Sequence, residues 1–294
     1  MRGIAIALSL LSAVALAFGA QFQNQAVGKT DKSAESKRLG LRAVLGLLKR
    51  PRWLTGMAFL VGGALLQITA LTLAPLIVVQ PIGAVALAIT ALLNARSTKR
   101  RVTRSTWVAI SLCTFGIATF VAVASTVAKE SHLDDGNLLQ ILSVLVGILV
   151  LFGIGFFTFA KRAKAITYIL GAGILYGFVA SLIKAVVQRI AQSDLTLLTI
   201  VCALTTGLAV LLGGWFVQNA YASGPPDLVI AGLTVVDPMV AVLVGIIVLG
   251  EAKSANPIVL ITFACSGLVA ITGVWLLSKV HPELAISRAD EANA

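Results

Sequence analysis

The chain has 294 residues, of which 58% are hydrophobic and only 12% are charged, and its mean hydropathy is +0.98. A water-soluble protein cannot bury that much apolar surface, so the composition excludes a soluble protein and favours an all-α polytopic membrane protein. The net charge of +11 does not indicate nucleic-acid binding, because the basic residues lie in loops between continuous apolar segments.

Nine apolar segments are long enough to cross a bilayer, whose hydrocarbon core of about 30 Å needs roughly 20 helical residues. The expected spans are residues 3–20, 53–73, 76–94, 105–127, 138–160, 165–190, 195–219, 227–250 and 257–277. A tenth span is an alternative: residues 39–48 are mostly apolar, but they are too few to cross and we expect them in the interface. Residues 1–20 also resemble a cleaved secretory signal, but the polar residues that follow favour a retained helix.

The basic residues are distributed unevenly between the two sides of the membrane. When the nine spans alternate in direction, 18 Lys and Arg residues fall on one side and four on the other. The largest group is the basic loop 28–52, which carries eight positive charges. The positive-inside rule then places the N-terminus outside and the C-terminus in the cytoplasm, with the polar tail 281–294. We expect a multi-pass protein of the plasma or inner membrane.

One motif occurs twice, each time near the middle of an expected span. The two copies read VVQPIGAVALAITALLNARS at residues 78–97 and VVDPMVAVLVGIIVLGEAKS at residues 235–254. The alternation of the spans gives the two copies opposite directions across the membrane. This pattern predicts two inverted repeats, residues 1–128 and 138–280, around a central cavity, which is the construction of many secondary transporters.

The polar residue and the proline of each copy are the first candidates for a site. Asp237 lies about 11 residues from either end of its span, where a charge costs roughly 2.5–3.5 kcal/mol on insertion scales. It is either a proton- or cation-binding carboxylate or a structural carboxyl group bonded to a neighbouring helix. Gln80, its counterpart, either coordinates a substrate or bonds a helix. Pro81 and Pro238 each remove one helical hydrogen bond and free a carbonyl group.

Four further residues are weaker candidates. Lys184 lies inside the sixth span, where it either pairs with Asp237 or extends its ammonium group to the outer interface. Gln67 and Gln23 either line the same cavity or bond neighbouring helices. Glu251 follows the end of the eighth span, and we expect it to be an exposed charge.

No metal, cofactor or enzymatic site is expected from the sequence. The three cysteines, Cys113, Cys202 and Cys265, lie inside apolar segments without metal-ligand spacing or a disulfide framework. The two histidines lie in expected loops, and the spans contain no arrangement of Ser and His, of paired Asp, or of His and Glu. The sequence therefore predicts neither an enzyme nor a cofactor.

The chain resembles the drug/metabolite transporter superfamily, and within it the NIPA-like branch of magnesium transporters. The most specific piece is APLIVVQPIGA at residues 74–84, and the others are FGA with FQ at 18–23, LKRPRW at 48–53, Ser181 with Lys184, and LGE at 249–251. The resemblance implies two inverted halves around a cavity, and transport as the activity. The branch carries an acid and an asparagine where this chain has Ala64 and Gln67, and loss of an acid weakens the magnesium reading.

Three functions follow as hypotheses. The first is a secondary transporter of small metabolites or drugs that works by alternating access, with proton coupling through Asp237. The second is a divalent cation (magnesium) transporter. The third is a non-transporting scaffold or complex subunit, whose basic loop binds anionic lipid or a partner. The expected partners are a small-molecule or ion substrate and the lipid bilayer, with a homodimer as an open alternative.

Overall fold

The computed structural model of the chain describes residues 2–27, 51–97, 103–129, 133–159, 165–223 and 226–280, and these residues form helices and no strands. The helices are α1 (Arg2–Val27), α3 (Pro51–Leu73), α4 (Leu76–Gly83), α5 (Val85–Ser97), α6 (Arg104–Val127), α7 (Asp135–Phe159), α8 (Ala165–Ala191), α9 (Leu197–Ser223), α10 (Pro226–Ile247) and α11 (Pro257–Val280). The expected interfacial stretch 39–48 and the tail 281–294 lie outside the described residues.

Within the described residues, nine helical segments have the length and hydropathy needed to cross a membrane, as the sequence predicts. The third of them consists of α4 and α5, which are separated only by Ala84. At this interruption the N–H group of Ala84 donates to the carbonyl oxygen of Pro81, three residues earlier, where an α-helix uses the fourth. The protein is therefore a multi-pass helical membrane protein, and one of its spans is interrupted within the repeated motif.

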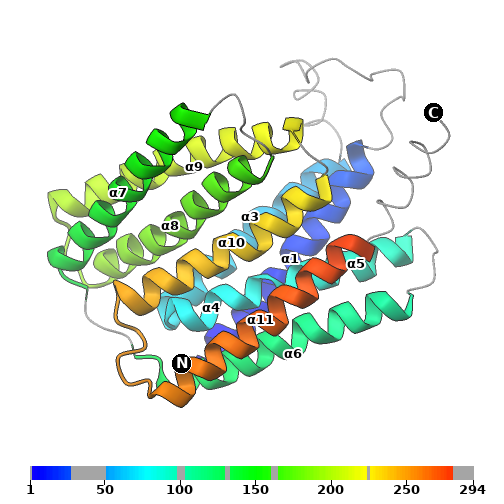
Figure 1. Ribbon diagram of the computed structural model, residues 1–294, viewed down its shortest axis with the longest axis horizontal. Helices are drawn as coiled ribbons and strands as arrows, with labels where there is room; N and C mark the ends of the chain where they lie inside the picture. The colour runs from blue at the N-terminus through cyan, green and yellow to red at the C-terminus, as the bar shows by residue number, and fades with distance from the viewer. Residues whose placement is uncertain are drawn as a thin grey trace.

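The helices lie side by side in one bundle, and in Figure 1 α4 and α10 lie between its two flanks. In this view α7, α8 and α9 form one flank, and α5, α6 and α11 form the other. Helix α8 has the largest buried share of the nine spans. Large apolar side chains cover the outside of the bundle, among them Phe115, Leu211 and Ile258, each more than two-thirds exposed. Such a surface is stable against lipid and unfavourable in water.

Helices α6 and α11 approach each other closely because glycines face the partner backbone. A Cβ atom added at Gly273 would lie 2.3 Å from the backbone nitrogen of Cys113, and one added at Gly116 would lie 2.5 Å from that of Ala270. Farther along the same pair, the rings of Phe120 and Phe263 stack with centroids 4.7 Å apart. Small residues at such contacts are how membrane helices gain packing energy without a hydrophobic effect between them.

We expect Gly273→Ala to lower the stability of the purified protein, because its methyl group forces the backbones of α6 and α11 apart. Overpacking of this kind costs about 1–3 kcal/mol. Gly207→Ala is the matched control, since a Cβ atom at Gly207 meets nothing within 4 Å. Thermal unfolding in the same detergent measures both variants. Equal melting temperatures for the two would contradict the close contact.

Candidate functional site

The two copies of the motif meet in the middle of the bundle. Helix α4 begins beside the end of α10: a Cβ atom added at Gly245 would lie within 3.3 Å of side-chain atoms of Ile77 and Leu76. Farther along, Pro81 and Pro238 line the same hollow. Residue numbers therefore rise along α4 as they fall along α10, so the two proline-bearing helices are antiparallel neighbours.

Asp237 opens onto a cavity of about 560 Å³ beside these helices. Two of the other residues that the sequence singles out, Gln67 and Gln80, line the same cavity, so the structure brings together three candidates from α3, α4 and α10. Tyr176 of α8 adds a phenol ring to the lining. The remaining lining residues are Leu16, Ala64, Ile68, Leu71, Gly83, Ala84, Val179, Ala180, Ile183, Leu233, Thr234 and Pro238.

The backbone at Asp237 is positioned by close packing of α10 on α8. A Cβ atom added at Gly177 would lie 2.8 Å from the Asp237 carbonyl oxygen, and one at Gly173 would lie 2.6 Å from Val236. The two glycines are thus a packing surface, as their spacing predicts. The Oδ1 atom of Asp237 is buried and accepts no hydrogen bond from the described residues. Burial of a charged oxygen is costly unless a donor, a proton or a cation satisfies it, so this atom is poised to bind one.

The two prolines add to the polarity of the bundle at this depth, although α10 continues without interruption through Pro238, where the sequence predicts a helix break. Because Pro238 has no N–H group, the carbonyl oxygen of Thr234, four residues earlier, loses its helical donor. Thr234 lines the cavity together with Asp237. The corresponding oxygen in the first copy is that of Ile77, four residues before Pro81, but Ile77 is fully buried and lines neither the cavity nor the neighbouring hollow.

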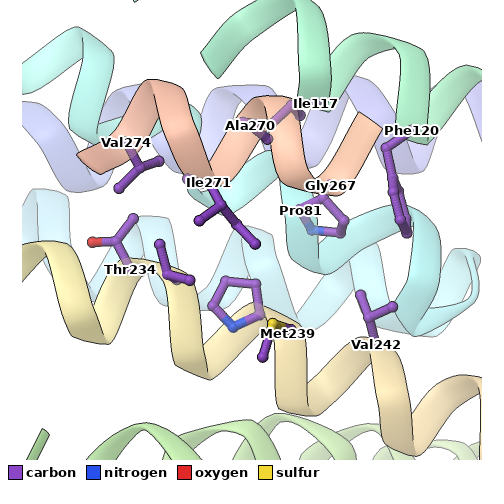
Figure 2. Close-up of a pocket in the computed structure, with 13 residues that line it drawn as sticks. Pro81, Ile117, Phe120, Thr234, Met239, Val242, Gly267, Ala270, Ile271 and Val274 are labelled. Atoms are coloured by element: carbon purple, nitrogen blue, oxygen red, sulfur yellow. The ribbon is translucent and has the colours of Figure 1, made fainter. Parts of the chain in front are cut away.

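A second, smaller hollow of about 110 Å³ lies between α4, α6, α10 and α11, and we call it the apolar chamber. Figure 2 shows the side chains of Ile271, Val242 and Phe120 around it. The apolar chamber and the cavity share three lining residues, Ala84, Thr234 and Pro238. The two hollows are therefore adjacent, one with a carboxylate in its wall and the other almost entirely apolar.

A buried ion pair lies near one end of the bundle. The carboxylate of Glu251 accepts hydrogen bonds from the backbone N–H groups of Leu76 (2.9 Å) and Ile77 (3.0 Å), the first residues of α4. Its Oε1 atom lies 3.5 Å from Nζ of Lys184, which donates to the carbonyl oxygen of Ala74 at 2.7 Å. Glu251 and Lys184 are 2% and 3% exposed. A negative group at the positive end of a helix is favourable, so Glu251 caps α4.

This pair corrects the environment expected for Glu251 and the partner expected for Lys184. Glu251 is not the exposed charge that its place after a helix predicts, because the turn at Gly250, with φ of 65°, folds the chain back over the start of α4. Lys184 is buried and paired with Glu251, which is neither of the two alternatives that the sequence left open, a pair with Asp237 or extension to the outer interface. Lys184 lies seven residues beyond Gly177, which is about 10 Å along α8 from the level of Asp237. The side chain of Gln23 lies outside the described residues.

Comparison with known proteins gives one informative match. An uncharacterized protein of Corynebacterium glutamicum is 27% identical over 279 residues, which cover 94% of this chain and 95% of that protein. No protein-family model matches the chain, and no solved structure matches it. The match to the Corynebacterium glutamicum protein therefore extends over nearly the full length of both proteins.

Of the residues in this region, Tyr176 was not predicted from the sequence, and Glu251 was predicted in the wrong environment. Tyr176 is an ordinary aromatic residue in an apolar span, and nothing in its neighbourhood marks it as part of a cavity wall. Glu251 did carry a signal: α4 starts after Pro75, and no side chain at that position caps the helix. A buried helix start without a local cap requires an acceptor from elsewhere in the fold, and a lone acid after a glycine is one source.

Proposed function

We propose that the protein is a secondary transporter that carries a small metabolite or drug-like molecule through the bilayer. The observation that carries this proposal is the buried Oδ1 atom of Asp237, which lies in a cavity wall near the middle of a membrane-spanning helix. A carboxylate in such a position is costly and typically marks a substrate or proton pathway. Gln67 and Gln80 contribute the neutral polar groups that orient a substrate in the same cavity.

The packing of the helices supports an inverted repeat. Helix α1 packs on α3 in antiparallel fashion, with Gly19 against Leu60 and Gly63 against Leu16, and α8 packs on α9 in the same manner. The span of α4 and α5 contacts α1 as α10 contacts α8. The helices α6 and α11 contact each other, as do α4 and α10. These pairs are those expected when spans one to four correspond to spans six to nine, with α7 as an addition.

We also propose membership of the drug/metabolite transporter superfamily, on the signature at residues 74–84 and the pairing just described. The orientation that we infer has the C-terminus in the cytoplasm of a plasma or inner membrane. It is supported by the helix ends at Arg52, Arg96, Arg104 and Lys279, which lie at the same end of the bundle. The basic loops of the sequence adjoin these ends.

Uptake by sealed vesicles containing the purified protein tests the proposal. The vesicles carry an imposed pH gradient, and a panel of metabolites, organic cations and toxins is offered to them. We expect saturable uptake of at least one class of compound that is absent from protein-free vesicles. Co-purification of a stoichiometric protein partner, with no flux of any compound in the panel, would overturn the proposal in favour of a scaffold or complex subunit.

A divalent cation is the second candidate substrate, because the cavity combines the Asp237 carboxylate with the amide oxygens of Gln67 and Gln80. Oxygen ligands of this kind suit Mg²⁺, which keeps several of its waters. If the protein carries Mg²⁺, we expect millimolar Mg²⁺ to raise its melting temperature and Asp237→Ala to abolish the increase. The same melting temperature with and without Mg²⁺ would count against this candidate.

A further inference from the structure

The cavity carries one negative charge, and this limits the charge of the ligand that it suits. Among the described residues that line it, Asp237 is the one acidic side chain, and none is basic. A monovalent cation balances one carboxylate in a region of low dielectric constant. A divalent ion with the same lining keeps an unbalanced positive charge, whose burial is unfavourable.

The shape and surface of the cavity suit an organic molecule. Its volume of about 560 Å³ lies in the range of small-molecule sites, roughly 300–1,000 Å³. Most of its wall is aliphatic, with residues such as Leu71, Val179 and Leu233. Tyr176 adds an aromatic ring, and aromatic rings beside a carboxylate are typical of sites for ammonium groups.

The apolar chamber adjoins the cavity at the proline of the second motif. The two hollows share Ala84, Thr234 and Pro238 in their walls, so they lie next to each other. The chamber's volume of about 110 Å³ is somewhat smaller than that of a cavity of about 150 Å³ that binds benzene in another protein. Such a hollow holds a short alkyl chain of a few methylene groups.

We propose that the two hollows form one site for a monovalent amphipathic organic cation, with its ammonium group against Asp237 and its apolar substituent in the apolar chamber. This inference rests on the proposed function, since it names the class of substrate that the transporter carries. Gln67 and Gln80 lie on the side of the charged group, and Ile271 and Val242 surround the substituent (Figure 2).

A series of alkyltrimethylammonium ions, from tetramethylammonium to the hexyl compound, tests the proposal by calorimetric titration of the purified full-length protein. We expect the affinity to rise about fourfold for each of the first few methylene groups and then to level off as the chamber fills. Asp237→Asn should weaken binding of every member, tetramethylammonium included, by at least tenfold. A neutral alcohol of the same shape should not bind the wild-type protein.

Gly267→Leu tests the chamber separately. Gly267 lines the apolar chamber, and a Cβ atom added there meets nothing within 4 Å, so leucine fills the chamber without a clash at its first carbon. We expect this variant to bind tetramethylammonium as the wild type does but to lose the gain with chain length. Gly207→Leu is the matched control, because Gly207 has equal room, lines neither hollow and should behave as the wild type.

Each outcome separates this inference from the proposed function. If the affinity rose with chain length equally in Gly267→Leu and Gly207→Leu, the alkyl chain would not be bound in the apolar chamber. The gain would then come from partition into detergent, or the chamber would hold lipid, and either result would overturn the two-part site. Absence of binding by every cation, together with uptake of a different compound class in vesicles, would overturn the inference and leave the transporter intact. Binding of the cations as expected, with no flux of any compound in vesicles, would overturn the proposed transport and leave the binding site intact.

Discussion

Asp237→Asn is expected to abolish the dependence of uptake on a pH gradient. In the proposed transport cycle the wild-type carboxylate alternates between binding a proton and binding a cation, and its buried Oδ1 atom, which has no donor among the described residues, is free for either. With one proton exchanged per substrate, each pH unit sustains about tenfold accumulation, since 1.4 kcal/mol is a factor of ten. Asparagine exchanges no proton, so the accumulation ratio should fall to about one at every imposed gradient.

Initial rates and final accumulation in vesicles measure this effect. Asp134→Asn is the matched control, because Asp134 is exposed and its carboxylate accepts a hydrogen bond from the backbone N–H group of Asn137. Asparagine accepts the same bond at the start of a helix, so this variant should behave as the wild type. Asp237→Glu keeps the charge and should retain part of the pH dependence. If Asp237→Asn followed the pH gradient as the wild type does, Asp237 would not be the proton carrier.

Glu251→Gln is expected to destabilise the protein by about 3 kcal/mol or more, the usual cost of removing one partner from a buried ion pair. The change leaves the ammonium group of Lys184 buried without its counterion. It also replaces a carboxylate that accepts two N–H groups of α4 with an amide that has one acceptor oxygen. Thermal or denaturant unfolding in detergent measures the loss. Lys253→Gln, an exposed position two residues away, is the control and should change little.

The double variant Lys184→Met/Glu251→Gln distinguishes an ion pair from two independent losses. When both charges are removed together, no uncompensated charge stays buried, and replacement of a buried pair is often close to neutral. We therefore expect the double variant to lose less stability than the sum of the two single variants, by about 1 kcal/mol or more. Additive losses would mean that Lys184 and Glu251 do not stabilise each other.

The membrane spans could be predicted from the sequence because hydrophobic thickness dictates their length. The expected span 257–277 agrees with the structure, and 53–73 differs by two residues at its start. The grouping of Gln80 with Asp237 was predicted because both precede a proline at the same depth of related spans. The break at Ala84 lies three residues past the break predicted at Pro81 and has no counterpart after Pro238, where α10 continues to Ile247.

The partners of the charged side chains could not be predicted in the same manner. Whether Lys184 pairs with Asp237 or with Glu251 depends on a distance along α8 and on a turn that returns the chain to α4, and neither is a property of local sequence. The wall of the cavity at Tyr176 depends on how α8 is rotated against α10. The roles of Lys184, Glu251 and Tyr176 can be assigned only after several helices have been placed relative to one another.

Glu251 also has a mechanical consequence for the bundle. Its side chain joins α4 and α8, and its backbone carbonyl oxygen accepts a hydrogen bond from the N–H group of Lys129, just after α6, at 2.9 Å. One residue thus ties four segments together at this end. Their separation here would break several buried polar contacts at once, so we expect the helices to resist separation at this end of the bundle.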